Sequence, residues 1–275
     1  MRVWSNRVNK IASRETYLLN LLNSTGRITT TEAVEMFGIS EATARRMFTK
    51  LERSGKIVRN YGGAQLAVST PNYSYEVRER EFRQEKLRIG RLAASLVENG
   101  DTIYLDCGTT VIQMALALAE RIANGELTHL NVITNSIVNV QALPTMEDCH
   151  VILVGGEYNN QRRDFSGPLT ERYVAPFHFS KCFLGCEGVN ERMGFSSNQF
   201  DISSLNTSVL ERTDIVYVLM DSSKYNHAGL LSYAPLDRVD IIVSDRLPDD
   251  GFAAAIAEAG TRILPVDPED SHAQR

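Results

Sequence analysis

Residues 40–64 read SEATARRMFTKLERSGKIVRNYGGA, and this stretch decides the fold of the N-terminal part of the chain. Ser40 can cap a helix that runs from residue 41 to about residue 53. Its inward positions have the spacing of one helix face: Ala44, Phe48 and Leu51. Arg45 and Arg46 lie about 100° apart around the axis, so they can address a base edge and a phosphate together.

The residues that follow this helix predict a wing. Residues 57–58 begin a strand, Gly62-Gly63 permit a tight reversal, and residues 64–66 form the returning strand. The glycines would bring backbone close to DNA, while Arg59 and Tyr61 can reach sugar and phosphate groups. A wing in this position favours a DNA-binding interpretation of the two arginines over a merely solvated helix face.

The residues that precede it complete a helix-turn-helix. Apolar residues at 17, 18, 21 and 22 predict a first helix that Gly26 stops, and apolar residues at 33, 34 and 37 predict a second helix. We expect Thr30 or Thr31 to cap the second helix and Gly38 to end it. Residues 14–66 are therefore predicted to form a winged helix-turn-helix. Its predicted DNA contacts are Ser40, Glu41, Thr43, Arg45, Arg46, Lys50, Lys56, Arg59, Tyr61, Gly62 and Gly63.

Charge is divided unevenly along the 275 residues. Residues 1–68 hold eleven Lys or Arg and five Glu, whereas the remainder holds eighteen basic and twenty-nine acidic residues. A basic head on an acidic body suits local attraction to the phosphate backbone of DNA. No apolar run approaches the roughly 20 residues that span a bilayer, and the N-terminus has no signal-peptide h-region, so we expect a cytoplasmic protein without membrane contact. The four cysteines are scattered, which favours free thiols over a metal site.

The acidic body predicts a second domain over residues 76–266. Residues 1–13 are interpreted as a flexible arm, 67–75 as a linker and 267–275 as a disordered tail. A charged helix is expected over residues 76–97, and a further helix over 111–122. Short β-rich runs alternate with helical segments, which indicates an α/β fold with a mainly parallel sheet covered on both faces. These runs are 102–106, 131–134, 150–154, 181–185, 215–220, 239–243 and 262–266.

Polar and glycine residues follow five of the predicted strands, where ligands of parallel α/β sheets bind. Taken singly, each cluster has an ordinary interpretation as a helix cap, a turn, a loop or a surface charge. Taken together, they describe a pocket for a small phosphorylated polyol, with Lys224 as the counter-charge and Asp106 or Glu187 accepting from sugar hydroxyls. The predicted effector contacts are Asp106, Gly108, Thr109, Thr110, Thr134, Asn135, Ser136, Gly155, Gly156, Gly185, Glu187, Gly188 and Lys224.

These motifs resemble the DeoR family of regulators of sugar catabolism. SEATARR, KLERSGKIVR and GGA resemble its DNA-binding signature, and Asp-x-Gly-Thr-Thr, Thr-Asn-Ser, Gly-Gly, Gly-x-x-Gly and Asp-Ser-Ser-Lys resemble its sensor domain. The resemblance implies a Rossmann-like sensor domain similar to ribose-5-phosphate isomerase, which binds a sugar phosphate without converting it. The chain departs from the family at Met47, where members usually have Asp, and in residues 201–207, which lack a Lys common in that helix.

Two functions remain open at this point. The first is a repressor of a carbohydrate-utilisation operon, whose affinity for double-stranded operator DNA changes when a sugar phosphate binds. The second is an isomerase-like enzyme with a DNA-binding head, for which Asp106, Glu187 and Lys224 would be the acid–base groups. The first is the stronger prediction, with no catalytic residue, no cofactor and no metal, and with self-association as a dimer or tetramer.

Overall fold

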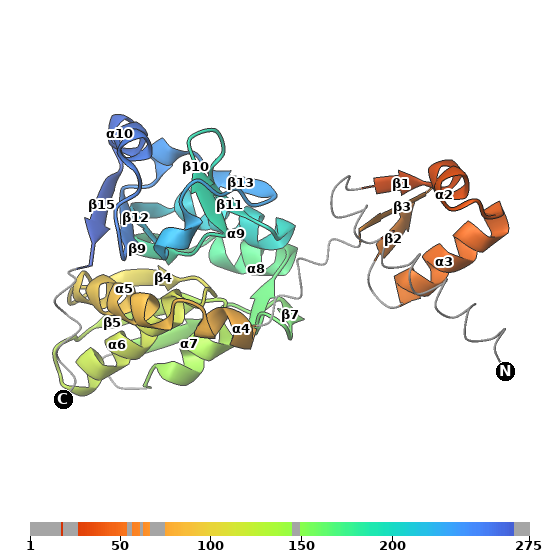
Figure 1. The fold of residues 1–275 in the computed structure, drawn as a ribbon. Coiled ribbons are helices and arrows are strands. Elements are labelled where there is room, and N and C mark those ends of the chain that lie inside the picture. The colour runs from red at the N-terminus through yellow and green to blue at the C-terminus, as the bar shows by residue number, and fades with distance from the viewer. Residues whose placement is uncertain are drawn as a thin grey trace. The chain divides into compact units, whose positions relative to one another are not determined.

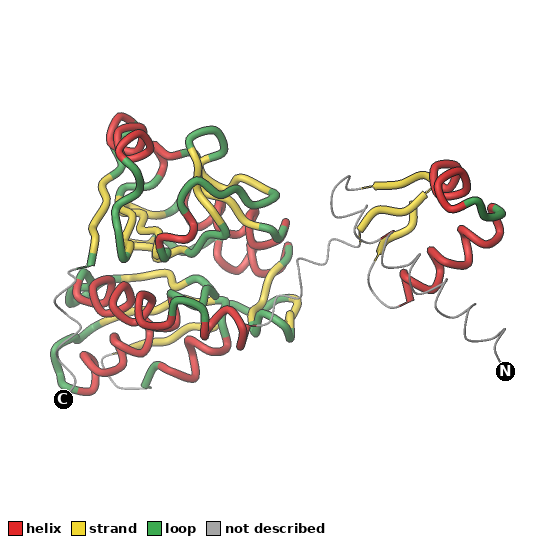
Figure 2. Tube along the Cα trace, viewed as in Figure 1, coloured by secondary structure: helices red, strands yellow, loops and turns green. Residues whose placement is uncertain are grey.

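The computed structural model describes residues 18, 27–53, 57–60, 63–66, 75–144 and 149–266, which form two compact units divided between Tyr73 and Ser74. The predicted arm at 1–13, the tail at 267–275 and the first predicted helix other than Leu18 lie outside the described residues. Figure 1 shows the elements of both units, and Figure 2 colours them by type. Each unit is described by itself.

The smaller unit contains a helix pair and a three-stranded antiparallel sheet of order β1-β3-β2. Gly38 adopts left-handed φ and ψ of 57° and 44° and ends α2 as predicted, which leaves a short turn before α3. The bounds of its elements are β1 (Arg27–Thr29), α2 (Thr30–Phe37), α3 (Glu41–Arg53), β2 (Ile57–Asn60) and β3 (Gly63–Leu66).

The cap of α2 differs from the prediction. Thr29, and neither Thr30 nor Thr31, accepts from the backbone N–H of Glu32 at 3.1 Å, while the Glu32 carboxylate accepts from the backbone N–H of Thr29 at 2.7 Å. Each side chain of this capping box accepts from the backbone N–H of the other residue, because Glu32 lies three residues after Thr29. The prediction was wrong because it placed the cap next to the first apolar residues of the helix and overlooked the Thr29–Glu32 pair.

The core of the smaller unit forms where α3 meets the sheet. The predicted inward residues of α3 are buried there, and so is Met47. Met47 therefore contributes to packing at the position where family members usually carry Asp. The core residues are Leu18, Ile28, Ala33, Ala44, Met47, Phe48, Leu51, Ile57 and Ala64.

The larger unit is built on a seven-stranded sheet of order β15-β14-β12-β9-β4-β5-β6 in which all pairs are parallel. All seven predicted strands are present. The bounds are β4 (Thr102–Leu105), β5 (Leu130–Thr134), β6 (Cys149–Leu153), β9 (Phe179–Leu184), β12 (Thr213–Leu219), β14 (Ile241–Ser244) and β15 (Arg262–Pro265). The predicted parallel α/β architecture is thus confirmed.

Helices cover both faces of this sheet (Figure 1). The helices α5 (Arg83–Ser95), α6 (Val111–Ala123) and α7 (Ile137–Ala142) lie on one face. The helices α8 (Pro168–Val174), α9 (Phe200–Leu210) and α10 (Asp250–Glu258) lie on the other. Gly90 lets α5 approach α6 closely, because a Cβ at that position would lie 2.5 Å from the backbone of Gln113.

The predicted helix over 76–97 is in fact two helices. A six-residue helix, α4 (Tyr75–Arg80), precedes α5, and Phe82 between them has a left-handed φ of 52°. No helix can continue through a residue of that conformation. α4 begins at Tyr75, the last residue of the predicted linker, whose side chain is buried.

Short antiparallel strands that were not predicted complete the larger unit. A hairpin forms from β7 (Glu157–Asn159) and β8 (Asp164–Ser166). A small sheet pairs β10 (Gly188–Asn190), β11 (Gly194–Ser197) and β13 (Leu231–Ala234). No helix among the described residues is long and apolar enough to cross a membrane, and they hold no group of three His, Cys, Asp or Glu placed to bind a metal ion.

Candidate functional site

The outer face of α3 is a polar surface with two arginines and a lysine. Arg45, Arg46 and Lys50 are exposed, as are Ser40 and Glu41 at the start of the helix. Thr43 is half-buried, and its backbone N–H donates to the Ser40 hydroxyl at 3.3 Å. The arrangement leaves three cations facing solvent on one helix, which is what contact with a nucleic-acid backbone and bases requires.

Two of these cations, Arg45 and Arg46, make only weak contacts within the protein. Arg45 pairs with Glu41 one turn earlier, at 2.5 Å, and both side chains are about two-thirds exposed, at 63% and 62%. The Arg46 Nε donates to the backbone carbonyl of Ala42 at 3.4 Å. Exposed ion pairs of this kind contribute about 0.3–0.5 kcal/mol, so a DNA phosphate or base could readily replace them.

The predicted wing is described only in part. Lys56, Tyr61 and Gly62 lie outside the described residues, and of Arg59 only the backbone, in β2, is described. Gly63 is buried in β3, where a Cβ would lie 2.2 Å from the carbonyl oxygen of Ile28 in β1. Glycine at this position is therefore needed for strand packing, besides any contact with DNA.

In the larger unit the sheet has a topological switch point between β4 and β9. From β4 the chain proceeds outward through β5 to β6, then returns to β9 on the other side of β4 and proceeds through β12. In parallel α/β sheets, ligands bind outside the carboxyl ends of the strands beside such a point. Of the five predicted clusters, those after β4 and β9 flank this point, and those after β5 and β12 lie one strand further out on either side.

Asp106 joins the two central loops. Its carboxylate accepts from the backbone N–H of Cys107 at 2.7 Å and from that of Gly185 at 3.0 Å. The side chain is 3% exposed, and burial raises the pKa of this carboxyl from its ordinary value, although the two N–H donors oppose the shift. Asp106 thus fixes the loop after β4 against the loop after β9.

Hydroxyl groups gather at the start of α6. Thr109 and Thr110 are 9% and 7% exposed, and the Thr110 side chain makes no capping hydrogen bond to the helix. Gly108 lies close to Gly185, where a Cβ would be in ordinary contact at 3.8 Å. This loop can present hydroxyls and backbone N–H groups to an anion at the positive end of the helix dipole.

Lys86 is a buried cation beside these loops. Its side chain is 4% exposed, its ammonium donates to the carbonyl oxygen of Arg78 at 2.5 Å, and no described carboxylate lies within ion-pair distance of it. Burial lowers the pKa of Lys86, and nearby Lys224 lowers it further, whereas Asp221 opposes the shift. The Arg78 carbonyl is therefore the hydrogen-bond partner of this ammonium, and the charges of Asp221 and Lys224, from the loop after β12, act on it in opposite directions.

Other predicted residues serve the scaffold. Thr134 donates to the carbonyl of Leu105 at 2.7 Å, and Ser136 caps α7. Gly155 accepts from the Thr170 hydroxyl at 3.0 Å, and Gly156 packs against the same side chain. A Cβ at Gly188 would lie 2.6 Å from the carbonyl of His227, so that glycine too is required by packing.

Two asparagines near these loops have unpaired side-chain oxygens. The Asn135 amide donates to the carbonyl of Phe165 at 2.9 Å, and the Asn139 amide donates to the carbonyl of Asp106 at 2.9 Å. Both Oδ1 atoms are buried and accept no hydrogen bond from a described residue. Buried acceptors of this kind are suited to a hydroxyl or a water.

Comparison with known proteins gives the chain a family. Residues 14–70 match the DeoR-like helix-turn-helix domain, and residues 81–246 match the DeoR C terminal sensor domain. The chain belongs to the DeoR family of transcriptional regulators. The HTH-type transcriptional repressor GlcR of Bacillus subtilis is 31% identical over 92% of this chain and 95% of its own.

Further DeoR-family relatives are repressors by name. The lactose phosphotransferase system repressor of Streptococcus mutans is 35% identical over 85% of this chain and 91% of its own. The glycerol-3-phosphate regulon repressor of Escherichia coli is 29% identical over 87% of this chain and 92% of its own. Ribose 5-phosphate isomerase A of Methanocaldococcus jannaschii overlaps 52% of this chain and 55% of its own, with 19% identity and a TM-score of 0.39.

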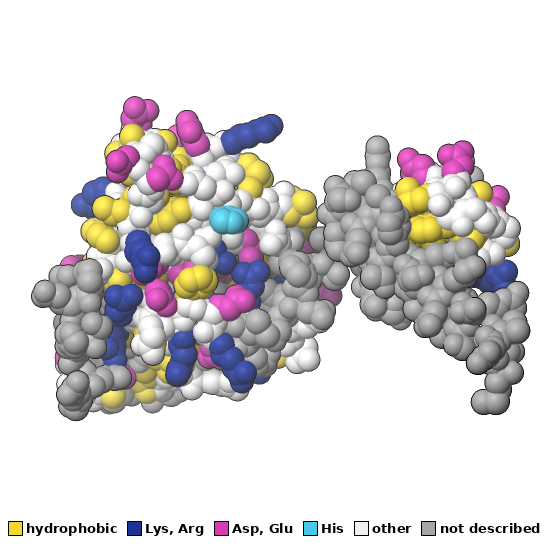
Figure 3. Space-filling model, viewed as in Figure 1, with side chains coloured by type: hydrophobic (Ala, Val, Ile, Leu, Met, Phe, Trp, Pro, Cys, Tyr) yellow, Lys and Arg dark blue, Asp and Glu magenta, His cyan; other side chains and the backbone are white. Residues whose placement is uncertain are grey.

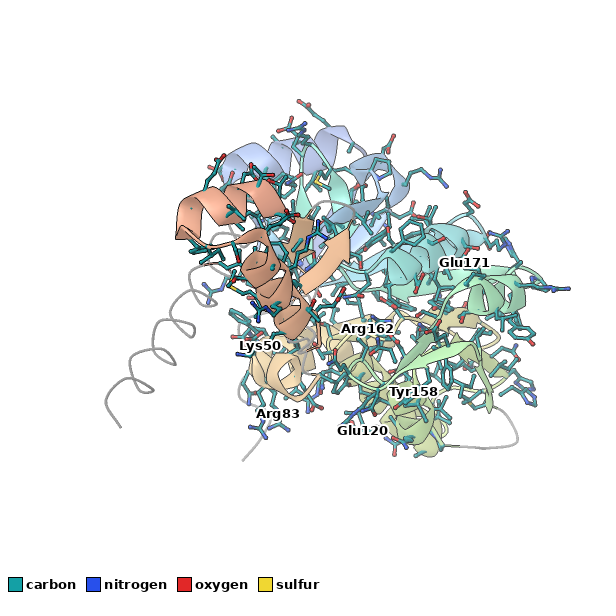
Figure 4. The ribbon with its side chains drawn as sticks, turned by 90° about the vertical axis from the view of Figure 1, so that its right-hand side faces the viewer. Lys50, Arg83, Glu120, Tyr158, Arg162 and Glu171 are labelled. Carbon is teal, nitrogen blue, oxygen red and sulfur yellow. The ribbon has the colours of Figure 1, made fainter. Side chains whose placement is uncertain are left out.

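The DeoR sensor unit also contains buried charged residues that are absent from the predicted effector contacts. Lys86 is one of them. The other pair is Arg162 and Asp164 in the β7–β8 hairpin, where Figure 4 labels Arg162. The guanidinium donates twice to the carboxylate, at 2.8 and 3.1 Å, and both side chains are buried. A Lys four residues before Gly90, which marks a close helix contact, was the available signal for burial of Lys86.

Proposed function

We propose that this DeoR-family regulator represses a carbohydrate-utilisation operon and that a sugar phosphate bound in the larger unit changes its affinity for operator DNA. The names of the three relatives support the repressor role. The observation that carries the effector role is the buried ammonium of Lys86, which donates to a backbone carbonyl and has no carboxylate within ion-pair distance among the described residues. A buried cation of this kind favours a small anion beside it.

For the operator we propose that α3 enters the major groove. Arg45 and Arg46 contact a guanine edge and a phosphate, Ser40, Glu41 and Thr43 lie at the end that enters first, and Lys50 contacts the backbone. The wing adds sugar and phosphate contacts through Lys56, Arg59, Tyr61 and Gly62-Gly63. The protein binds as a dimer or tetramer, because two heads on repeated half-sites multiply affinity.

For the effector we propose that the phosphate lies between the start of α6 and the two lysines. Gly108, Thr109 and Thr110 supply N–H and hydroxyl donors, and Lys86 and Lys224 supply charge. The sugar hydroxyls extend toward Glu187 and the unpaired oxygens of the two asparagines. Of the predicted contacts, Thr134, Gly155, Gly156 and Gly188 shape this site through packing rather than by touching the ligand.

The isomerase-like alternative is less well supported by the geometry. Both oxygens of Asp106 already accept backbone N–H groups, and Glu187 pairs with Arg78 at 2.9 Å. A general base needs a free oxygen within reach of the substrate proton, which Asp106 lacks. Binding without conversion therefore accounts better for the buried Asp106.

A thermal-shift screen of the full chain against sugar phosphates and their unphosphorylated sugars tests this function. A matching phosphate at about 100 times its Kd should stabilise the larger unit by about 2.7 kcal/mol, and the parent sugar should not. Lys224→Ala should abolish the shift while DNA binding persists, and exposed Arg238→Ala should leave both unchanged. If no sugar phosphate stabilises the protein, or if one is isomerised, this proposal is wrong.

A further inference from the structure

Helix α4 is the first described element after residues 67–74, which connect the two units along the chain. It has only six residues, and Phe82, with its left-handed φ of 52°, separates it from α5. Six residues are too few for a helix to be stable by itself in water. The side chains that hold α4 in place therefore decide whether it stays folded against the larger unit.

Two polar contacts hold α4 to the candidate effector site. The Arg78 guanidinium pairs with the Glu187 carboxylate at 2.9 Å, and these side chains are 25% and 20% exposed. The Lys86 ammonium donates to the backbone carbonyl of Arg78 at 2.5 Å. We refer to the two contacts together as the α4 latch.

Tyr75 fixes the other end of α4. It is 1% exposed, and the Arg163 guanidinium lies 5.2 Å from the centre of its ring. Arg163 adjoins the buried Arg162–Asp164 pair of the β7–β8 hairpin. α4 thus contacts the loop after β9, helix α5 and the hairpin, and two of these three carry residues proposed to touch the effector.

Each half of the α4 latch involves a group that an anionic sugar derivative would engage. A phosphate oxygen is a stronger acceptor for the buried ammonium of Lys86 than a neutral carbonyl is. Sugar hydroxyls would donate to the Glu187 carboxylate and weaken its pair with Arg78. Ligand and α4 consequently compete for the same two side chains.

We propose that Arg78 is the residue through which the occupied site acts on the DNA-binding unit. This inference rests on the proposed sugar-phosphate function. Binding of the anion draws Lys86 away from the Arg78 carbonyl and separates Arg78 from Glu187. Helix α4 then loosens, and the change reaches residues 67–74 by continuity of the chain. The two states are the latched and the unlatched α4, and the effector binds the unlatched state better.

Hydrogen–deuterium exchange of the full chain, with and without inorganic phosphate, tests this directly. In the wild type, phosphate should release Lys86 from the Arg78 carbonyl and raise the exchange of the α4 amides by about tenfold. Arg78→Met keeps the aliphatic stem and this carbonyl but removes the pair with Glu187, so its α4 amides should exchange faster than those of the wild type without phosphate, and faster still with it. Exposed Arg238→Met should behave as the wild type, and Glu187→Gln, which opens the latch from the other side, should behave as Arg78→Met.

DNA affinity gives a second readout, measured on a fragment that the wild type selects from a random pool. Arg78→Met without phosphate should shift the affinity for this fragment in the same direction as phosphate shifts that of the wild type. Phosphate that binds and changes DNA affinity but leaves α4 exchange unaltered contradicts the latch alone. Failure of phosphate to bind the wild type contradicts both the latch and the proposed anion effector.

Discussion

The cations of the two units differ in their exposure to solvent. Arg45 on α3 is 63% exposed, whereas Lys86 on α5 is 4% exposed. The α3 cations sit in a surface position where a long polyanion can reach them and where salt screens them. Lys86 is reached only by a ligand small enough to enter between helices and loops. Figure 3 shows Lys and Arg interspersed with Asp and Glu on the visible face of the larger unit.

Under the proposed function, this difference means that the two units recognise negative charge by different physical means. The exposed cations gain from counterion release, so several of them share the affinity and each contributes modestly. A buried ammonium has already lost its hydration, so one good acceptor recovers a large interaction there. Substitutions should therefore have graded effects on DNA binding and all-or-none effects on the effector response.

The largest expected effect tests whether the units are separate at all. Phe48, which is 1% exposed, fills the core of the smaller unit, and Phe48→Ala should cost about 3–5 kcal/mol there. Calorimetry should show that only the transition of the smaller unit moves, with DNA binding lost and the phosphate response of the larger unit kept. Phe200→Ala, at a side chain that is 73% exposed, is the matched control and should change little. A joint shift of both transitions would contradict independent units.

The second prediction concerns the buried cation. Lys86→Met should reduce phosphate affinity by about tenfold to a hundredfold, since a hydrogen bond to a charged group contributes about 1.5–3 kcal/mol. Isothermal titration with inorganic phosphate measures this, and Arg91→Met, an exposed position on the same helix, is the control. Undiminished affinity in Lys86→Met would remove Lys86 from the site.

The Lys86→Met variant also tests how the unfolding free energy depends on pH. The pKa of Lys86 is lowered in the folded protein, so the unfolded chain holds this proton more tightly. As pH rises from the lowered folded pKa toward 10.5, the unfolding free energy of the wild type should therefore increase relative to that of Lys86→Met. Below that window the difference should be constant. A decrease over the same range, in denaturant titrations, would mean that burial does not dominate the pKa.

Much of the fold was predictable from the sequence, but the burial of Lys86 was not. The seven parallel strands were predicted because strands covered on both faces are continuous apolar runs. The short strands β7, β8, β10, β11 and β13 were missed, because three or four residues with polar or glycine positions carry no periodic signal. Lys86 was left out of the predicted contacts because a lysine in a highly charged helix is as readily solvated as buried, and only the folded unit shows that it is 4% exposed.

A further prediction grades the cations proposed to contact DNA. Arg45→Ala should cost about 1–3 kcal/mol on the selected DNA and relax discrimination at one base pair. Lys50→Ala and Lys56→Ala should weaken all sequences alike and lower the salt slope by about one unit each. Anisotropy titrations with selected and scrambled duplexes at several salt concentrations separate the two outcomes. Equal losses on both duplexes in Arg45→Ala would mean that it contacts only the backbone.

The smallest expected effect concerns Glu41, which both belongs to the proposed DNA surface and pairs with Arg45. Glu41→Gln removes an exposed i,i+4 ion pair, so the unfolding free energy should fall by only about 0.3–0.5 kcal/mol. The same change releases Arg45 and removes a negative charge that faces phosphate, so affinity for selected and scrambled duplexes should rise together, by about twofold. Glu52→Gln, near the other end of α3, is the matched control for lost charge. If affinity falls on the selected duplex alone, Glu41 reads a base, and its pairing with Arg45 is a resting contact that DNA replaces.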